Sequence, residues 1–274
     1  RGIPLEGSSI AIVGVGNVGS RVAKKAEALG MKCLLNDPPK QRATADPIYI
    51  SLGDAVENAD YVTLHVPLER KGPDATVDMA DRRFFRALRQ GVVFLNTSRG
   101  QVVVEEALAE AIDRQKVSLA ILDVWQNEPE IDEQLVRRAF LGTAHIAGYS
   151  YDGKVNATLM VYEALCEYLQ RRMDLTASEF LPPPEAPRVD LSKFPGSDQD
   201  VLIEAIRHVY DIRKDDRDLR RAVRDKETRG KRFELLRKAD PHRREFHNTE
   251  LVLPAGRVTL ARKAEALGFR IAQV

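Results

Sequence analysis

Short apolar runs alternate along the first half of the chain with segments in which apolar residues recur every three or four positions. Continuous apolar runs are typical of buried parallel strands, whereas the three-to-four spacing is typical of helices. Their alternation predicts an α/β fold, a doubly wound parallel sheet with helices on both faces. The predicted strands are residues 9–14, 31–37, 60–66, 91–97 and 117–124, and the predicted helices are 17–29, 79–89 and 104–114.

The pattern changes after residue 150. Residues 154–171 have the apolar spacing of one long helix, and FLPPPEAP at 180–187 is typical of a stiff, extended linker. Beyond the linker we expect helices at 199–213 and on to about 239, a strand at 250–254, a helix at 257–267 and a strand at 269–274. We therefore predict a nucleotide-binding domain at 1–150, the helix and proline-rich linker at 151–187, and a small α+β C-terminal domain at 188–274.

A glycine-rich turn, GVGNVG, joins the first predicted strand to the first predicted helix. Gly14 permits the tight turn, Gly16 lets the backbone approach a pyrophosphate, and Gly19 lets helix and strand pack closely. Asp37 ends the next strand, where a carboxylate accepts hydrogen bonds from ribose hydroxyls and repels a 2′-phosphate. This context predicts a Rossmann-type site for NAD rather than NADP. The residues of the turn that we expect at the cofactor are Gly14, Gly16, Asn17, Val18 and Gly19.

Three later segments end at the same carboxyl edge of the predicted sheet, where doubly wound folds bind ligands. Arg99 offers a planar fork of donors that grips a carboxylate. His145 is suited to take a hydroxyl proton as hydride leaves the adjacent carbon. Glu128 is placed to hydrogen-bond the far nitrogen of that imidazole and fix its tautomer. Alone, Arg99 would be read as a surface charge and Glu128 as a turn residue, but together the three residues predict hydride chemistry on a hydroxy acid.

The order of the motifs GVGNVG, NTSRG, LDVWQNEP and HIAGYS resembles the D-2-hydroxyacid dehydrogenase family. Further segments are similar to a branch of that family that acts on a phosphorylated four-carbon hydroxy acid: LLNDPP, EIDEQL, HIAGYS followed by DGK, RHVYDIRKDD and LGFRIAQV. The resemblance covers essentially the whole chain. It implies NAD as cofactor, a small phosphorylated hydroxy acid as substrate, and a homodimer formed through the C-terminal domain.

The resemblance also implies roles for single residues. Arg99, Glu128 and His145 would be catalytic, and Arg99 would bind the substrate as well. Tyr149 would reach the substrate. Val66 stands where the family often has threonine, so we expect only backbone contact with NAD there. The residues that the resemblance places in the NAD site beyond the glycine turn are Asp37, Val66, Asp123 and Gly148.

Composition narrows the classes of function. The chain of 274 residues is 43% hydrophobic and shows no secretory signal and no apolar run long enough for a membrane span, so we expect a cytoplasmic protein. Cys33 and Cys166 have no metal-binding spacing, which predicts buried reduced thiols and no metal site. Residues 213–232 contain ten basic and five acidic side chains. Because the acids are interleaved and aromatic residues are absent, we expect solvated helices and no nucleic-acid contact.

Members of the family carry a further segment before the position that corresponds to Arg1, and it forms most of their substrate domain. The resemblance therefore implies a fragment or a truncated form, in which the helix at 154–171 exposes an apolar face. Two alternatives stay open at this point. One is another D-2-hydroxyacid dehydrogenase that acts on phosphoglycerate or hydroxypyruvate, and the other is a catalytically incomplete NAD-binding module that dimerises.

Overall fold

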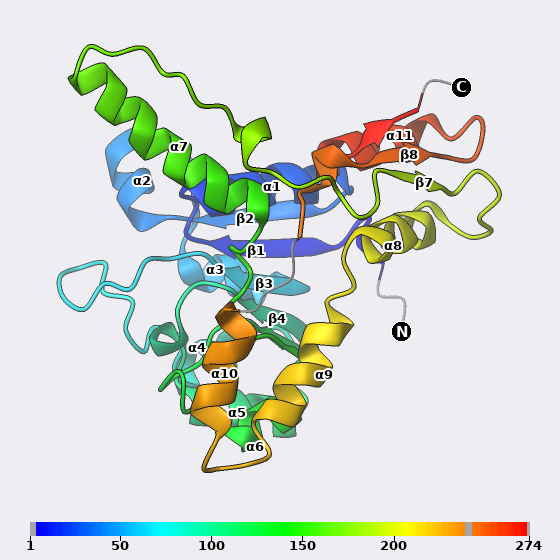
Figure 1. The fold of residues 1–274 in the computed structure, drawn as a ribbon. Helices are drawn as coiled ribbons and strands as arrows, with labels where there is room; N and C mark the ends of the chain where they lie inside the picture. Colours follow the sequence, from blue (N-terminus) through cyan, green and yellow to red (C-terminus); the bar gives the residue numbers. More distant parts are fainter. Residues whose placement is uncertain (1–3, 239–242, 273–274) are drawn as a thin grey trace. The chain divides into compact units, whose positions relative to one another are not determined.

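The computed structural model of the protein describes residues 4–238 and 243–272 (Figure 1). These residues form two compact units. The first contains the described residues up to Ala147 together with Ile212–Lys238, and the second contains Gly148–Asp211 together with residues 243–272. This division differs from the predicted one, because residues 212–238 belong to the first unit and not to a separate C-terminal domain.

The first unit is built on a sheet with the strand order β2-β1-β3-β4-β5-β6. All neighbouring strands run parallel, which confirms the predicted doubly wound sheet. The order changes direction at β1, between β2 and β3, and ligands bind at the carboxyl ends of strands beside such a switch point. The strands are β1 (Ser9–Val13), β2 (Lys32–Asn36), β3 (Tyr61–Leu64), β4 (Val92–Asn96), β5 (Val117–Leu122) and the unpredicted β6 (Leu141–Gly142).

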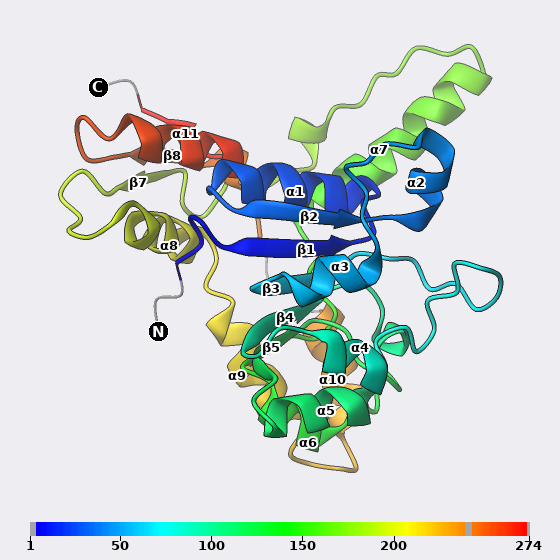
Figure 2. The same ribbon diagram turned by 180° about the vertical axis from the view of Figure 1, so that it is seen from behind.

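Figure 2 shows this sheet as a ribbon from behind. Successive residues of β1 point to opposite faces of the sheet, and each face has its own apolar core. Ile10 and Ile12 pack with Ala23 and Ala26 of α1 (Asn17–Ala28). Ala11 belongs to the larger core on the other face. That core is covered by α3 (Leu52–Glu57), α4 (Arg82–Ala87) and α5 (Glu105–Asp113), where the rings of Phe84, Phe85 and Phe94 meet edge to face.

Helix α2 (Pro38–Thr44) directly follows the second strand and was not predicted from the sequence. Asp37 is its N-cap, and the Asp37 side chain accepts a hydrogen bond from the N–H of Lys40 at 3.0 Å. Proline is tolerated in the first turn of a helix, because the N–H groups there have no intrahelical partner. Pro38 and Pro39 therefore start a helix instead of ending regular structure.

Helices α9 (Arg213–Ala222) and α10 (Arg229–Lys238) complete the first unit beside β6 and α6 (Glu133–Arg138). Leu219 and Phe233 are fully buried in the core of that unit. Arg220 donates to the carbonyl oxygens of Val136 and Ala139, each at 2.8 Å. Because few apolar residues stand among the charged ones, the sequence predicted solvated helices within the C-terminal domain at 188–274 and gave no sign of these buried contacts.

The second unit contains a parallel three-stranded sheet, β7-β8-β9, within its described residues. Val189 of β7 and Leu251 of β8 are buried, as are Leu260 and Ala264 of the helix α11. The sequence missed β7, which has only three residues and follows the prolines of the linker. The elements are α7 (Tyr151–Tyr168), η2 (Ala177–Glu179), β7 (Arg188–Asp190), α8 (Asp198–Val209), η3 (Phe246–Asn248), β8 (Glu250–Val252), α11 (Val258–Leu267) and β9 (Arg270–Ile271).

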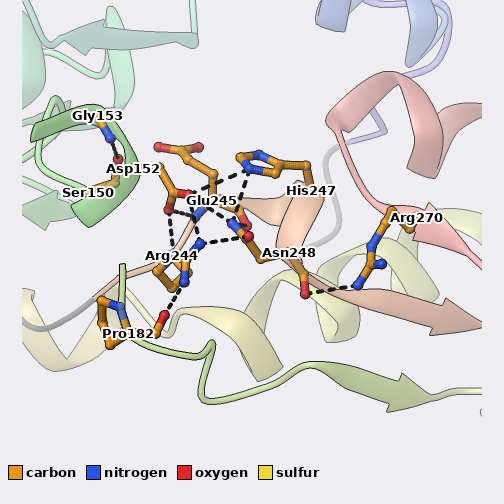
Figure 3. Close-up of polar contacts among 9 residues, drawn as sticks. All are labelled: Ser150, Asp152, Gly153, Pro182, Arg244, Glu245, His247, Asn248 and Arg270. Atoms are coloured by element: carbon orange, nitrogen blue, oxygen red, sulfur yellow. Dashed lines mark hydrogen bonds and ion pairs between the residues drawn. The ribbon is translucent and has the colours of Figure 1, made fainter. Parts of the chain in front are cut away.

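A buried polar cluster around Asp152 joins the first turn of α7 to the segment before β8 (Figure 3). The Asp152 carboxylate accepts hydrogen bonds from Arg244 Nε at 2.9 Å, from the N–H of Glu245 at 2.8 Å and from Asn248 Nδ2 at 3.1 Å. Arg244 also donates to the carbonyl of Pro182 in the linker. Burial by itself raises the pKa of Asp152, but these donors outweigh it and lower the pKa to about 2.

Both cysteines are free thiols, with Cys166 buried and Cys33 half-buried. Burial raises the pKa of Cys33 to about 11, so the group stays protonated at neutral pH.

Across residues 4–238 and 243–272, none of the helices combines the length and the apolar character needed to cross a bilayer.

Candidate active site

The glycine turn between β1 and α1 requires glycine at two positions for steric reasons. Gly14 has φ +87°, and a Cβ there would lie 2.8 Å from the carbonyl carbon of His65. A Cβ at Gly19 would lie 2.0 Å from the carbonyl oxygen of Gly14. The close approach of α1 to β1 therefore excludes any side chain at Gly19. The sequence predicted that Gly14 permits the tight turn. The structure shows in addition that Gly14 packs against the backbone of His65, directly after β3.

Gly16 differs, because a Cβ on this residue would meet no atom within 4 Å. It is exposed together with Asn17 and Val18, and α1 begins here without a side-chain cap. The first N–H groups of a helix carry partial positive charge and bind phosphate oxygens. An open, uncapped helix start beside a glycine fits the pyrophosphate of a dinucleotide, which would occupy the space next to Gly16.

Asp37 lies beside this turn, at the carboxyl end of β2. Its Oδ2 accepts the N–H of Val15 at 2.8 Å, while Oδ1 caps α2. The carboxylate thus joins the β1 and β2 ends, and each oxygen keeps a further lone pair for a ribose hydroxyl. Asp37 also lines a cavity of about 610 Å³ with Gly14 and Val66. The cavity has room for an adenosine group, so the residues present fit NAD.

His145 and Glu128 form the hydrogen-bonded pair that the sequence predicted. The distance from His145 Nδ1 to Glu128 Oε2 is 2.7 Å, and the side chains are 26% and 19% exposed. Glu128 Oε1 accepts the N–H of Trp125 at 2.9 Å, which fixes the carboxylate from its other side. Because Nδ1 is engaged with Glu128, Nε2 is the ring nitrogen that is left to exchange a proton.

Arg99 follows β4 by three residues and is exposed. Its Nη1 donates to the carbonyl of Ser98 at 2.7 Å, which leaves most of the guanidinium donors available. The next residue, Gly100, packs directly on the turn that carries Glu128, because a Cβ there would lie 1.9 Å from the carbonyl oxygen of Trp125. This contact places the Arg99 segment against the Glu128 turn.

Asp123 is buried and acts within the protein. Its Oδ1 accepts the Thr143 hydroxyl at 2.6 Å and the N–H of Ile146 at 2.8 Å, and its Oδ2 accepts the N–H of Ala147 at 2.9 Å. These bonds hold the backbone on both sides of His145, which has the unusual φ of +57°. The predicted contact of Asp123 with NAD stays a prediction, and only one lone pair of Oδ2 is left for it.

The remaining predicted residues divide between the two units. Val66 lines the cavity beside Gly14, whereas Gly148 and Tyr149 belong to the second unit. There the ammonium of Lys154 lies 4.3 Å from the centre of the Tyr149 ring. His65 directly follows β3 and is hydrogen-bonded within the protein. Its Nε2 lies 3.0 Å from the Thr63 hydroxyl, and burial lowers its pKa to about 4.

One carboxylate near the pair was missed from the sequence. Glu105 begins α5, and its Oε1 accepts the N–H of Gln126 at 2.7 Å on the turn that carries Glu128. Two adjacent glutamates at a helix start look like ordinary first-turn acids that interact with the helix dipole. No local signal distinguishes Glu105 from the exposed Glu106, because its partner is 21 residues away in the sequence.

Comparison with known families agrees with this geometry. Residues 1–147 match the NAD-binding domain of the D-isomer specific 2-hydroxyacid dehydrogenases, and residues 180–268 match a family described as a domain of unknown function, DUF3410. The chain therefore belongs to the D-isomer specific 2-hydroxyacid dehydrogenase family, and NAD is the cofactor of its first unit.

Individual relatives are more specific. The chain is similar to erythronate-4-phosphate dehydrogenase of Bacteroides fragilis, with 42% identity over 215 residues, covering 78% of this chain and 59% of that protein. It is 38% identical over 268 residues to the enzyme of the same name from Edwardsiella ictaluri, covering 98% of this chain and 69% of the relative. Among solved structures, a glyoxylate reductase from Paecilomyes thermophila matches with a TM-score of 0.52 and 28% identity, covering 64% of this chain and 53% of that one.

Proposed function

We propose that the complete protein containing this chain oxidises 4-phospho-D-erythronate at its C2 hydroxyl with NAD, a step of pyridoxal phosphate biosynthesis. The observation that carries this proposal is the 2.7 Å hydrogen bond that Glu128 Oε2 accepts from His145 Nδ1, at the carboxyl edge of an NAD-binding sheet. The names of the relatives support the substrate, and the family supports the reaction class.

The chemistry divides between charge recognition and proton transfer. Arg99 binds the substrate carboxylate, which orients the C2 hydroxyl toward His145. His145 Nε2 takes the hydroxyl proton while the C2–H bond breaks and the carbonyl forms. Glu128 stabilises the imidazolium that results, because its carboxylate faces the protonated Nδ1. NAD, which would be held at Gly16 and Asp37, supplies the acceptor for the hydride that leaves C2.

Tyr149 contacts the substrate, the protein acts in the cytoplasm, and residues 188–274 contribute the surface through which it forms a homodimer. The chain spans 59% of the length of the Bacteroides relative and 69% of the Edwardsiella relative. The activity is therefore assigned to the complete protein and not to these 274 residues alone.

A substrate panel with the complete protein tests this assignment. NADH formation is followed at one enzyme concentration with 4-phospho-D-erythronate, 3-phosphoglycerate and unphosphorylated D-erythronate. We expect the highest kcat/KM for the first, and a loss of at least about tenfold when the phosphate is absent, since each lost charged contact costs more than about 1.4 kcal/mol. Preference for another hydroxy acid would contradict the substrate. NADH binding without turnover of any of them would instead favour a non-catalytic module.

A further inference from the structure

Two carboxylates hold consecutive N–H groups of the turn that carries Glu128. Glu128 itself accepts the N–H of Trp125, and Glu105 accepts the N–H of Gln126. The Gln126 carboxamide donates in return to the carbonyl of Val103 at 3.0 Å, just before α5. The turn is thus tied at residue 126 to the start of α5 by both its backbone and its side chain.

Glu105 is a titratable group that the proton transfer described above does not use. It is half-buried, and removal from water raises its pKa to about 7. The N–H of Gln126 opposes this effect, while three neighbouring carboxylates add to it: Asp132 at the N-cap of α6, Glu106 on α5 and Glu128 on the turn. Glu105 therefore changes its charge in the pH range in which an imidazole also titrates.

We propose that Glu105 is a positioning residue for proton transfer: it fixes the turn that carries Glu128, and its charge sets how readily the Glu128–His145 pair holds a proton. The inference rests on the proposed role of that pair as the proton acceptor. Glu105 reaches His145 only through Glu128 and the turn, and it touches neither substrate nor cofactor in this assignment.

The sign of the electrostatic effect follows from the charges. The negative charge of ionised Glu105 lies at the turn that carries Glu128. A negative charge there favours the imidazolium form of His145 over its neutral form. Neutral Glu105 withdraws that support. Glu105 acts on the pair through Glu128, since Glu128 is one of the carboxylates that raise the pKa of Glu105. Glutamine at position 105 removes the charge, while its carboxamide oxygen still accepts the N–H of Gln126.

The test is an NMR titration of the histidine ring signals of this chain, without substrate or cofactor. His145 is assigned by the signal that disappears in His145→Ala. In Glu105→Gln we expect the midpoint of the His145 titration to fall by roughly 0.3 to 1 pH unit, as for the loss of one partly screened charge. Glu106→Gln is the matched control, since it removes the same charge from the next, exposed position and should shift the midpoint by less than about 0.1 unit.

Two results would overturn the proposal: an unchanged midpoint in Glu105→Gln, or an equal shift in Glu106→Gln. If Glu105→Gln does not fold, carbon-13 titration of the Glu105 carboxyl in the unmodified chain decides. A midpoint near 7 supports the proposal, and one at about 4.3, the value of a free side chain, overturns it. The titration measures no turnover, so it is independent of the substrate panel. If the shift is found but the complete protein oxidises no hydroxy acid, the proposed function is refuted, whereas the effect of Glu105 on the Glu128–His145 pair is not.

Discussion

At the scale of single residues, Gly16 and Gly19 of the glycine turn differ in why a side chain is excluded. Gly19 is needed for packing, since a Cβ would lie 2.0 Å from the Gly14 carbonyl oxygen, whereas Gly16 faces open space. Gly16 also has φ −71°, which alanine adopts without strain. The fold therefore does not require glycine at Gly16, and we propose that the bound cofactor does.

The pair Gly16→Ala and Gly19→Ala tests this separation. We expect Gly16→Ala to keep the melting temperature within about 2 °C but to weaken NADH binding at least about tenfold, because the new methyl group occupies the pyrophosphate space. Gly19→Ala should unfold at a temperature lower by more than about 5 °C, since helix and strand must separate. Differential scanning fluorimetry and NADH fluorescence titration measure both effects. Equal NADH affinity in Gly16→Ala and the unmodified chain would contradict the assignment.

Much of the candidate site could be predicted from the sequence, because its residues follow directly after parallel strands. Asp37, Asp123 and His145 stand one to three positions past β2, β5 and β6, and parallel strands bring those ends to one edge. What each side chain does there could not be predicted. The engagement of Asp123 with the His145 backbone and of Glu105 with Gln126 depends on contacts between distant segments.

At the scale of elements, the second unit contains a buried ion pair between Asp152 and Arg244. Their side chains are 3% and 9% exposed, so neither charge is well solvated once its partner is removed. Asp152→Asn should lower the free energy of unfolding of this unit by about 3–5 kcal/mol at neutral pH, the usual cost of leaving one buried charge unpaired. Chemical denaturation followed by circular dichroism measures it. Glu167→Gln, an exposed change on the same helix, is the control.

The pH dependence of this ion pair gives a second check on the same element. Because the pKa of Asp152 is depressed to about 2, its contribution is complete above the pKa of about 4 in the unfolded chain. The contribution is lost as the pH falls from there toward 2. Asp152→Asn should therefore show a smaller loss of stability between pH 5 and pH 2 than the unmodified chain. An equal loss in both would contradict the depressed pKa.

The helices α9 and α10 pack in the first unit, and this assignment can be tested by mutation. Phe233 of α10 is fully buried in the core of the first unit. Phe233→Ala should cost about 3–5 kcal/mol and lower the unfolding midpoint of the NAD-binding unit, which bound NADH reports. Leu235→Ala, on the same helix but 63% exposed, is the control and should change the midpoint little. Loss of stability confined to the second unit would contradict the packing of α10.

The elements that could be predicted are those with a clear apolar period. Strands β1 to β5 and helices α1 and α5 were expected near their observed positions, since each buries several consecutive or regularly spaced side chains. The helix α7 was also expected, although it begins at Tyr151 rather than 154. Short elements such as β6 and β7 bury too few residues to show a pattern. The prolines at the start of α2 concealed that helix.

At the scale of the whole molecule, residues 180–268 match a different family from the NAD-binding part, although Ile212–Lys238 within that range belong to the first unit. The chain crosses between the units at Ala147, two residues after His145, and returns through Ile212–Lys238. A division into consecutive domains does not describe this arrangement. The boundary predicted at residue 188 follows a change in amino-acid composition, whereas the units divide after Ala147, before Ile212 and after Lys238. The candidate proton acceptor therefore lies next to a chain crossing between units.

The central claim is that His145 is the group that takes the substrate proton. Replacement by alanine in the complete protein, with NADH affinity and steady-state oxidation of 4-phospho-D-erythronate measured on the same preparation, tests it most directly. We predict that kcat falls by at least about 10³-fold while the NADH dissociation constant changes less than about threefold, because a general base contributes about 10²–10⁴ and is not needed for cofactor binding. Turnover within tenfold of the unmodified protein would contradict the account.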